Sequence, residues 1–146
     1  MTTAIHRRVD ALRAGRDPAF VARLASGWAV LGERQVLPGY CLLLPDPVVP
    51  ALNALAGRER TAFLEDMAAL GDAVLAVTRA VRINYAIFGN QDPALHAHVI
   101  PRYHDEPAPQ ATAHPWTYDW SRAPAFEAEA HRELRNALHA ALGGAR

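Results

Sequence analysis

The sequence predicts one α+β domain over residues 1–146, with about five short strands in a mainly antiparallel sheet that one long helix covers. Short apolar runs bounded by Gly and Pro recur between residues 28 and 100, a pattern typical of strands. Residues from about 58 to 81 repeat apolar side chains at helical spacing. Consecutive strand candidates have tight connections, which favours antiparallel pairing.

The first part of the chain predicts two helices and then strands. A helix over residues 3–14 is followed by Asp17-Pro18, which resembles a cap and first turn, so we expect a second short helix there that carries Phe20, Val21 and Leu24 inward. Strands are then expected over residues 28–31, 36–37 and 40–44, with a turn at Gly32-Glu33.

The second part predicts the long helix and the end of the sheet. An irregular stretch over 48–56 precedes the helix at 58–81, and residues 82–88 and 95–100 are expected to form an antiparallel strand pair. These elements and the earlier strands make a core of about 28–103. The proline-rich and aromatic segment 104–123 predicts an ordered wrap, and a C-terminal helix is expected over 124–142.

Composition excludes several classes of function. All 15 basic residues are arginines, scattered among 15 acidic ones for a net charge of zero, so a nucleic-acid partner is not expected. The absence of lysine excludes Schiff-base chemistry and a Walker-type phosphate loop. With one cysteine, no secretory signal and no run of about 20 apolar residues, we expect no membrane association and a cytoplasmic location.

The strand candidate at 95–100 carries two histidines on one face. Because side chains alternate along a strand, His96 and His98 share a side, opposite an apolar one. Asn84 on the neighbouring strand candidate, the loop amides at 90–91 and Arg102 are hydrogen-bond donors close to the pair in sequence. Donors without acids indicate an anionic ligand, and imidazole titrates near neutral pH, so this stretch predicts a reaction site.

Other readings of the residues stay open. The two histidines also fit the wet side of an edge strand, or a metal site in which zinc takes one or two further ligands. Serine chemistry has little support, because Ser26 and Ser121 lie outside any Gly-x-Ser-x-Gly turn. Cys41 lies in an apolar run and predicts a buried thiol without a catalytic role.

Residues 96–102, His-Ala-His-Val-Ile-Pro-Arg, resemble the end of the histidine triad (HIT) signature. Gly89-Asn90 stands where the family has a glycine and a polar residue before the triad. Residues 38–45, Pro-Gly-Tyr-Cys-Leu-Leu-Leu-Pro, resemble the family's earlier Pro-Gly-His strand. The resemblance covers about 28–103, roughly half the chain, and implies a HIT-like fold.

Two positions depart from the family pattern. Ala94 replaces the first triad histidine, and Tyr40 stands where many members have histidine. The resemblance implies that His96 is the nucleophile that attacks the α-phosphorus of a nucleotide, and that His98 contacts the phosphate and helps the leaving group depart. In the family a backbone carbonyl at the first triad position orients the nucleophile, and Ala94 keeps that carbonyl.

The resulting hypothesis is a hydrolase of nucleotide phosphoanhydrides or phosphoramidates, such as dinucleoside polyphosphates, that forms a phosphohistidine on His96 and uses His98 as an imidazolium donor. We expect the substrate to be bound by Asn84, Gly89, Asn90 and Gln91.

The resemblance also bears on cofactors and partners. No metal or cofactor is expected on the protein; a divalent cation would accompany only the substrate phosphates. The family's ribose-binding acid falls at Gly32, beside Glu33, and members are commonly homodimers, so a homodimer is expected. The alternatives are a nucleotide-binding HIT-like protein without catalysis and a His-x-His metal-binding protein.

Overall fold

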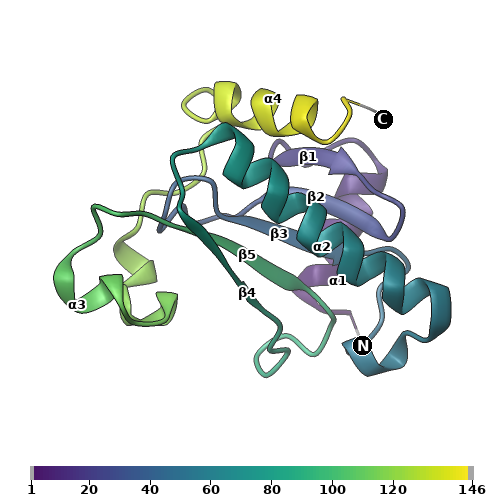
Figure 1. Cartoon of the computed structure of the whole chain (residues 1–146). Helices are drawn as coiled ribbons and strands as arrows, with labels where there is room; N and C mark the ends of the chain where they lie inside the picture. Colours follow the sequence, from purple (N-terminus) through teal and green to yellow (C-terminus); the bar gives the residue numbers. More distant parts are fainter. Residues whose placement is uncertain (1, 145–146) are drawn as a thin grey trace.

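Five antiparallel strands form the centre of the computed structural model, which describes residues 2–144 (Figure 1). They are ordered β1-β2-β3-β5-β4, and every neighbouring pair is antiparallel. The bounds are β1 Phe20–Arg23, β2 Gly27–Leu31, β3 Cys41–Pro45, β4 Arg82–Ala86 and β5 Ala97–Arg102. The α+β class and the mainly antiparallel sheet are therefore confirmed.

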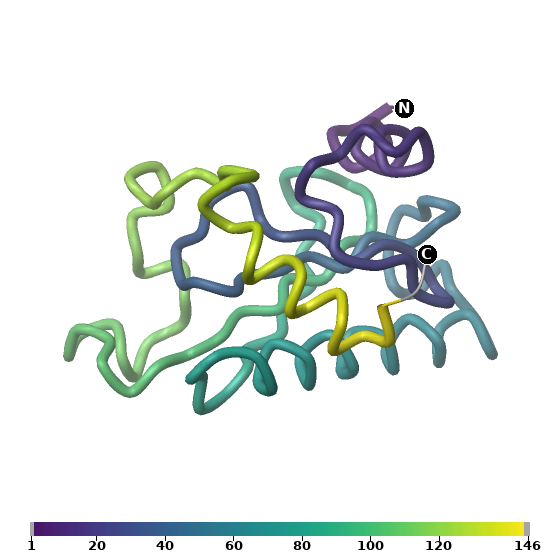
Figure 2. The backbone as a smooth tube through the Cα atoms, turned by 90° about the horizontal axis from the view of Figure 1, so that it is seen from above, coloured from purple at the N-terminus to yellow at the C-terminus, as the bar shows by residue number. Residues whose placement is uncertain are grey.

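Helices cover both faces of this sheet. α2 (Gly57–Val77) and α4 (Arg132–Ala141) pack on one face, whereas α1 (Ala4–Arg13) lies on the other (Figures 1 and 2). The 21-residue α2 is the predicted long helix, although it ends four residues earlier, where the Thr78 hydroxyl donates to the Val74 carbonyl at 2.7 Å. No helix within residues 2–144 is both long and apolar enough to cross a membrane.

The core divides into two apolar clusters, one on each side of the sheet. The cluster below α2 and α4 includes Cys41, Ala97 and Val99, and the cluster below α1 includes Leu42 and Ile100. Alternation along β3 and β5 distributes these side chains between the two faces. The face towards α1 is the one that carries the histidines, so α1 helps to define their surroundings.

The short helix expected around residues 20–24 is wrong, because these residues form β1. β1 pairs with β2 through a two-residue hairpin in which Leu24 and Gly27 exchange backbone hydrogen bonds. An irregularity between Phe20 and Ala22 interrupts the ladder, and a bulge of this kind hides the period of two in the sequence. A Cβ at Gly27 would lie 1.9 Å from the Leu44 carbonyl oxygen, so this tight approach requires glycine.

The strand expected at 36–37 and the early start of the last helix are also wrong, for a common reason. The backbone N–H of Gln35 donates to the Pro124 carbonyl at 2.7 Å, and the backbone N–H of Phe126 donates to the Glu33 carbonyl at 2.8 Å. These bonds pair the loop after β2 with residues 124–126 and hold both stretches extended. α4 consequently begins at Arg132, and residues 36–37 form no strand.

The segment after β5 folds into α3 (Ala108–Ala111) and two 3₁₀ turns, Pro115–Thr117 and Trp120–Arg122. Arg102, the last residue of β5, holds it in place. Its Nη1 donates to Asn84 Oδ1 at 2.8 Å and to the Ala113 carbonyl at 2.7 Å, and its Nη2 donates to Glu106 Oε1 at 2.9 Å and to the Gln110 carbonyl at 2.7 Å.

The Glu106 carboxylate is the second centre of this network. Besides Arg102, it accepts the Tyr118 hydroxyl and the Tyr103 amide, each at 2.7 Å. Burial opposes its ionisation, but the hydrogen bonds from Arg102, the Tyr103 amide and Tyr118 outweigh burial and hold the pKa of Glu106 below its ordinary value. The segment after β5 is therefore fixed by a charged and fully paired cluster.

Replacement of Arg102 by methionine is expected to destabilise the protein by about 3 kcal/mol, because it leaves the Glu106 carboxylate without its cation. The Arg102 and Glu106 side chains are only 9% and 3% exposed. Arg132→Met is the matched control, because its partner Glu129 is 76% exposed and such pairs contribute about 0–1 kcal/mol. Urea unfolding measures both; equal losses would contradict the role given to Arg102.

Candidate active site

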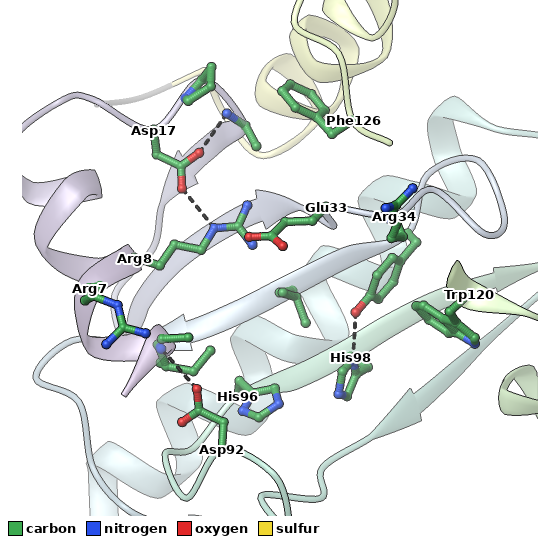
Figure 3. Close-up of a pocket in the computed structure, with 16 residues that line it drawn as sticks. Arg7, Arg8, Asp17, Glu33, Arg34, Asp92, His96, His98, Trp120 and Phe126 are labelled. Carbon is green, nitrogen blue, oxygen red and sulfur yellow. Dashed lines mark hydrogen bonds and ion pairs between the residues drawn. The ribbon is translucent and has the colours of Figure 1, made fainter. Parts of the chain in front are cut away.

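The two histidines lie side by side on the sheet face that α1 covers (Figure 3). His98 belongs to β5, where it is opposite Leu42 of β3 and Ala86 of β4, and His96 immediately precedes the strand. Their ring centroids are 5.0 Å apart and the rings are nearly perpendicular, at 72°. The predicted alternation, with an apolar face opposite two imidazoles, is present.

A backbone carbonyl fixes the orientation of His96. His96 Nδ1 lies 2.8 Å from the Ala94 carbonyl oxygen. A carbonyl oxygen accepts and cannot donate, so Nδ1 must carry the hydrogen. Neutral His96 therefore has its lone pair on Nε2, and this nitrogen is available as a nucleophile.

A phenol contacts the other imidazole. The Tyr40 hydroxyl lies 2.7 Å from His98 Nδ1, and Tyr40 itself is 4% exposed. Burial, and secondarily the nearby His96, lowers the pKa of His98 to about 4. His98 is therefore neutral at pH 7 in the free protein. The imidazolium expected from the sequence belongs to the reaction with substrate and stays a prediction.

Three aromatic rings contact His98, and a fourth packs against two of them. The ring centroids of Trp116 and Phe88 lie 5.1 and 5.8 Å from that of the imidazole, and Trp120 stacks on Trp116 at 5.1 Å. Tyr40 completes the group and contacts the edge of Trp120. The wrap expected at 104–123 thus docks on the histidines, a contact that the sequence did not reveal because aromatic residues in a loop carry no periodicity.

Two cavities meet at the histidines. The larger, of about 720 Å³, extends from His96 and His98 towards α1 and the loop after β2. The smaller, of about 380 Å³, is lined by the same two histidines and by Phe88, Trp116 and the loop 89–92. The imidazoles therefore stand where two separate spaces join, each large enough to hold part of a small-molecule ligand.

The structure brings most of the predicted binding residues to the pair. Gly89, Asn90 and Gln91 line the smaller cavity together with both histidines. Asn84 does not reach it: Asn84 is opposite Ile100, and its Oδ1 accepts a hydrogen bond from Arg102. Both Asn84 and Arg102, expected near the anion, instead stabilise the segment after β5, and they line a different cavity.

Most charged residues of the larger cavity, with the exception of Glu33, were missed from the sequence. Arg7 and Arg8 of α1 and Arg34 of the loop after β2 line it, as do Asp17 and Glu33. Arg8 Nε and Asp17 Oδ2 form a largely buried ion pair at 2.9 Å, next to Glu33 in Figure 3. No motif connects these positions; only the packing of α1 against the sheet brings them together.

Comparisons with known proteins identify the fold. No sequence-family model matches the chain, and no curated protein matches it either. Among solved structures, a histidine triad protein from Bradyrhizobium japonicum has a TM-score of 0.73 and 21% identity, over 89% of this chain and 94% of the other. The chain has the histidine triad fold. The HIT-like architecture expected from residues 38–45 and 89–102 is confirmed.

Two further structures with this fold are similar. A hypothetical histidine triad nucleotide-binding protein from Sulfolobus tokodaii has a TM-score of 0.72 at 14% identity, over 93% of this chain and 91% of the other. A zinc-bound histidine triad family protein from Mycobacterium smegmatis has a TM-score of 0.66 at 19% identity, over 92% and 91%. At these identities the likeness concerns the fold.

The first triad position, Ala94, is fully buried in the apolar cluster below α1, together with Ile5. The adjacent loop is tied to the same helix, because the Ile5 amide donates to Asp92 Oδ2 at 3.2 Å. The other oxygen of that carboxylate is buried and has no hydrogen-bond partner among the described residues. Ala94 therefore contributes its carbonyl to His96 and its methyl group to packing.

The donor set does not fit zinc. Catalytic zinc sites use three protein ligands and structural sites four. Within residues 2–144, no group of three or more His, Cys, Asp or Glu side chains is arranged to hold a metal ion. The His-x-His pair therefore lacks the further protein ligands that such a site needs.

The depressed pKa of His98 predicts a loss of stability in acid. In the unfolded chain His98 takes up a proton below about pH 6.5, whereas in the folded protein it does so only near pH 4. Its contribution to the free energy of unfolding is therefore complete above pH 6.5 and decreases as the pH falls to 4. At pH 4.5 the free energy of unfolding is lower by about 2 kcal/mol from this cause. Urea unfolding at pH 7 and pH 4.5 measures it, and His98→Gln should show a smaller difference than the wild type; equal differences would contradict it.

Proposed function

We propose that the protein is a HIT-type hydrolase of nucleotide phosphoanhydrides or phosphoramidates that acts through a nucleotidyl intermediate on His96. The observation that supports this most is the 2.8 Å contact between His96 Nδ1 and the Ala94 carbonyl, since it leaves the Nε2 lone pair free beside the two cavities. An anchored neutral imidazole of this kind is a competent nucleophile.

The proposed reaction has two displacements at phosphorus. His96 Nε2 attacks the α-phosphorus and forms a P–N bond while the bond from phosphorus to the leaving oxygen or nitrogen breaks. Water then attacks the nucleotidyl-histidine, its oxygen bonds to phosphorus, and the P–N bond breaks to return the imidazole. Each displacement transfers one proton, which the second histidine can carry.

His98 is the proposed proton carrier. It is neutral in the free protein, and a phosphate anion bound beside it opposes the burial that lowers its pKa, so substrate binding favours proton uptake. The proton then goes to the leaving atom. In the second step the neutral imidazole accepts a proton from the attacking water.

The loop after β4 and the two cavities suit the rest of the substrate. Backbone amides of Gly89, Asn90 and Gln91, with the two side-chain amides, would contact phosphate oxygens from the smaller cavity. The larger cavity has room for a nucleoside and offers Glu33 for polar contacts. A divalent cation would enter with the phosphates and not on protein ligands.

The single buried cysteine supports a cytoplasmic location.

The second candidate is a nucleotide-binding protein without catalysis. The burial of Ala94 beneath α1 favours it, because no third imidazole is available at that position. The two candidates differ in one observable. Rapid acid-free quenching after incubation with a radiolabelled dinucleoside polyphosphate traps label on the enzyme, whereas a binding protein gives reversible binding without label or product.

His96→Ala is expected to abolish both turnover and labelling, because no other imidazole replaces its Nε2, while nucleotide binding stays measurable. His104→Ala is the matched control, since His104 lines two cavities that contain neither His96 nor His98. Initial rates with diadenosine polyphosphates and with nucleoside phosphoramidates measure the outcome. Retention of most activity by His96→Ala would contradict the proposed nucleophile.

We also propose that two copies pair along the β4 edge. β4 has a neighbour on one side only. Tyr85 of this strand lies against α2, where a Cβ at Gly71 would be 2.0 Å from its hydroxyl, and it is 42% exposed, as is Leu75 of α2 at 40%. An open edge beside exposed apolar side chains suits a symmetric contact between identical chains.

Leu75→Arg is expected to convert the dimer to a 15.9 kDa monomer, because it places two like charges in the symmetric contact. Ala137→Arg on the exposed side of α4 is the control and should leave the mass unchanged. Sedimentation equilibrium measures both. A wild-type monomer, or a Leu75→Arg dimer of unchanged affinity, would contradict the proposed interface.

A further inference from the structure

Tyr40 is held rigidly between β2 and the histidines. Its backbone carbonyl accepts the Gly32 amide at 2.9 Å and Gln35 Nε2 at 3.0 Å, and its ring meets the edge of Trp120 at 5.1 Å. The ring lies directly on Gly32, where a Cβ would be 2.2 Å from two ring carbons. Only glycine at position 32 leaves room for this ring, so the two residues are coupled by packing.

The hydroxyl of this rigid ring meets the second histidine. Among residues 2–144, His98 Nδ1 is the one hydrogen-bond partner of the Tyr40 hydroxyl, at 2.7 Å. Burial raises the pKa of Tyr40 well above its ordinary value, so the phenol keeps its proton at neutral pH. With no other acceptor, that proton points to Nδ1. The hydrogen of neutral His98 then belongs on Nε2.

We propose that Tyr40 is a positioning residue that holds His98 of the free protein in the Nε2–H tautomer. His98 then presents a hydrogen-bond donor to the incoming phosphate while it is still uncharged, before it takes up a proton beside the bound substrate. The inference deepens the proposed function and rests on it for the role of His98. The two neighbouring imidazoles then have opposite tautomers. A carbonyl, which only accepts, gives His96 a free Nε2 lone pair, and a hydroxyl that donates gives His98 an Nε2 hydrogen.

The different hydrogen-bond partners of the two Nδ1 atoms give two chemically identical side chains different roles. His96 attacks because its Nε2 has a lone pair, and His98 binds the anion because its Nε2 has a hydrogen. If Nδ1 of His98 carried the hydrogen, its Nε2 lone pair would face the phosphate oxygens and repel them. Tyr40 thus determines which of the two histidines serves as the donor.

Nitrogen NMR of histidine-labelled protein tests the tautomers directly, without substrate. In the wild type we expect Nδ1 of His98 to be unprotonated and hydrogen-bonded, and Nδ1 of His96 to be protonated. Tyr40→Phe keeps the ring over Gly32 and removes only the hydroxyl. It should abolish the hydrogen-bond shift at His98 Nδ1 and admit the Nδ1–H tautomer, while the His96 signals stay as they were.

Gly32→Ala should disrupt the same hydrogen bond indirectly. Its Cβ displaces the Tyr40 ring, so His98 should show the change seen in Tyr40→Phe, and the double variant should add nothing at His98. Tyr85→Phe is the matched control and should leave the His98 signals unchanged, because the Tyr85 hydroxyl lies against Gly71 of α2, on the other face of the sheet. Should Gly32→Ala not fold, Tyr40→Phe decides the question alone.

Kinetics supply the second readout. Tyr40→Phe should lower kcat/KM about tenfold, which corresponds to one lost hydrogen bond between neutral groups, while labelling of His96 persists. Unchanged His98 signals in Tyr40→Phe, or a wild-type His98 protonated on Nδ1, would overturn the positioning role even if the enzyme hydrolyses nucleotides. A wild type with the expected tautomers but no hydrolysis would instead overturn the proposed function and leave the tautomer assignment intact.

Discussion

The buried ion pair between Arg102 and Glu106 is the interaction on which the site side of the molecule depends. Arg102 closes β5 four residues after His98, and its five donors all point to partners in β4 and in the segment after β5. A buried guanidinium is stable only when such partners are present. The network therefore fixes the path by which Trp116 and Trp120 return to cover His98. Without these hydrogen bonds, the segment that carries Trp116 and Trp120 would not be held against His98.

Covering His98 has an electrostatic consequence. The rings of Trp116, Phe88 and Tyr40 exclude water from one side of the imidazole, and this desolvation is the main reason that its pKa falls. A neutral imidazole has one donor and one acceptor nitrogen, so the hydrogen-bond partner of Nδ1 sets whether Nε2 donates or accepts in the cavity. Burial by the aromatic segment and orientation by Tyr40 are thus two parts of one arrangement.

The sequence predicted what periodicity and motifs can encode. The α2 stripe and the alternation around His96 and His98 led to the right face and fold, because both repeat over several residues. The first strand was misread since a bulge interrupts its alternation. Asn84 was misplaced because strand pairing predicts proximity, whereas its amide is already held by Arg102. The contact of Tyr40 with His98 joins residues 58 apart and depends on a ring seated on Gly32, which no local pattern reveals.

Position 94 shows that the orientation of His96 needs the backbone of this residue and not a particular side chain. The orientation of His96 depends on a carbonyl oxygen, which every residue supplies at position 94 provided that the loop keeps its path. That path is set from α1, through the bond from the Ile5 amide to Asp92 and through the shared apolar cluster. A larger polar side chain at position 94 would displace Ile5 or lose its own hydrogen bonds. In this chain, therefore, the methyl group of Ala94 packs beneath α1 while its backbone carbonyl orients His96.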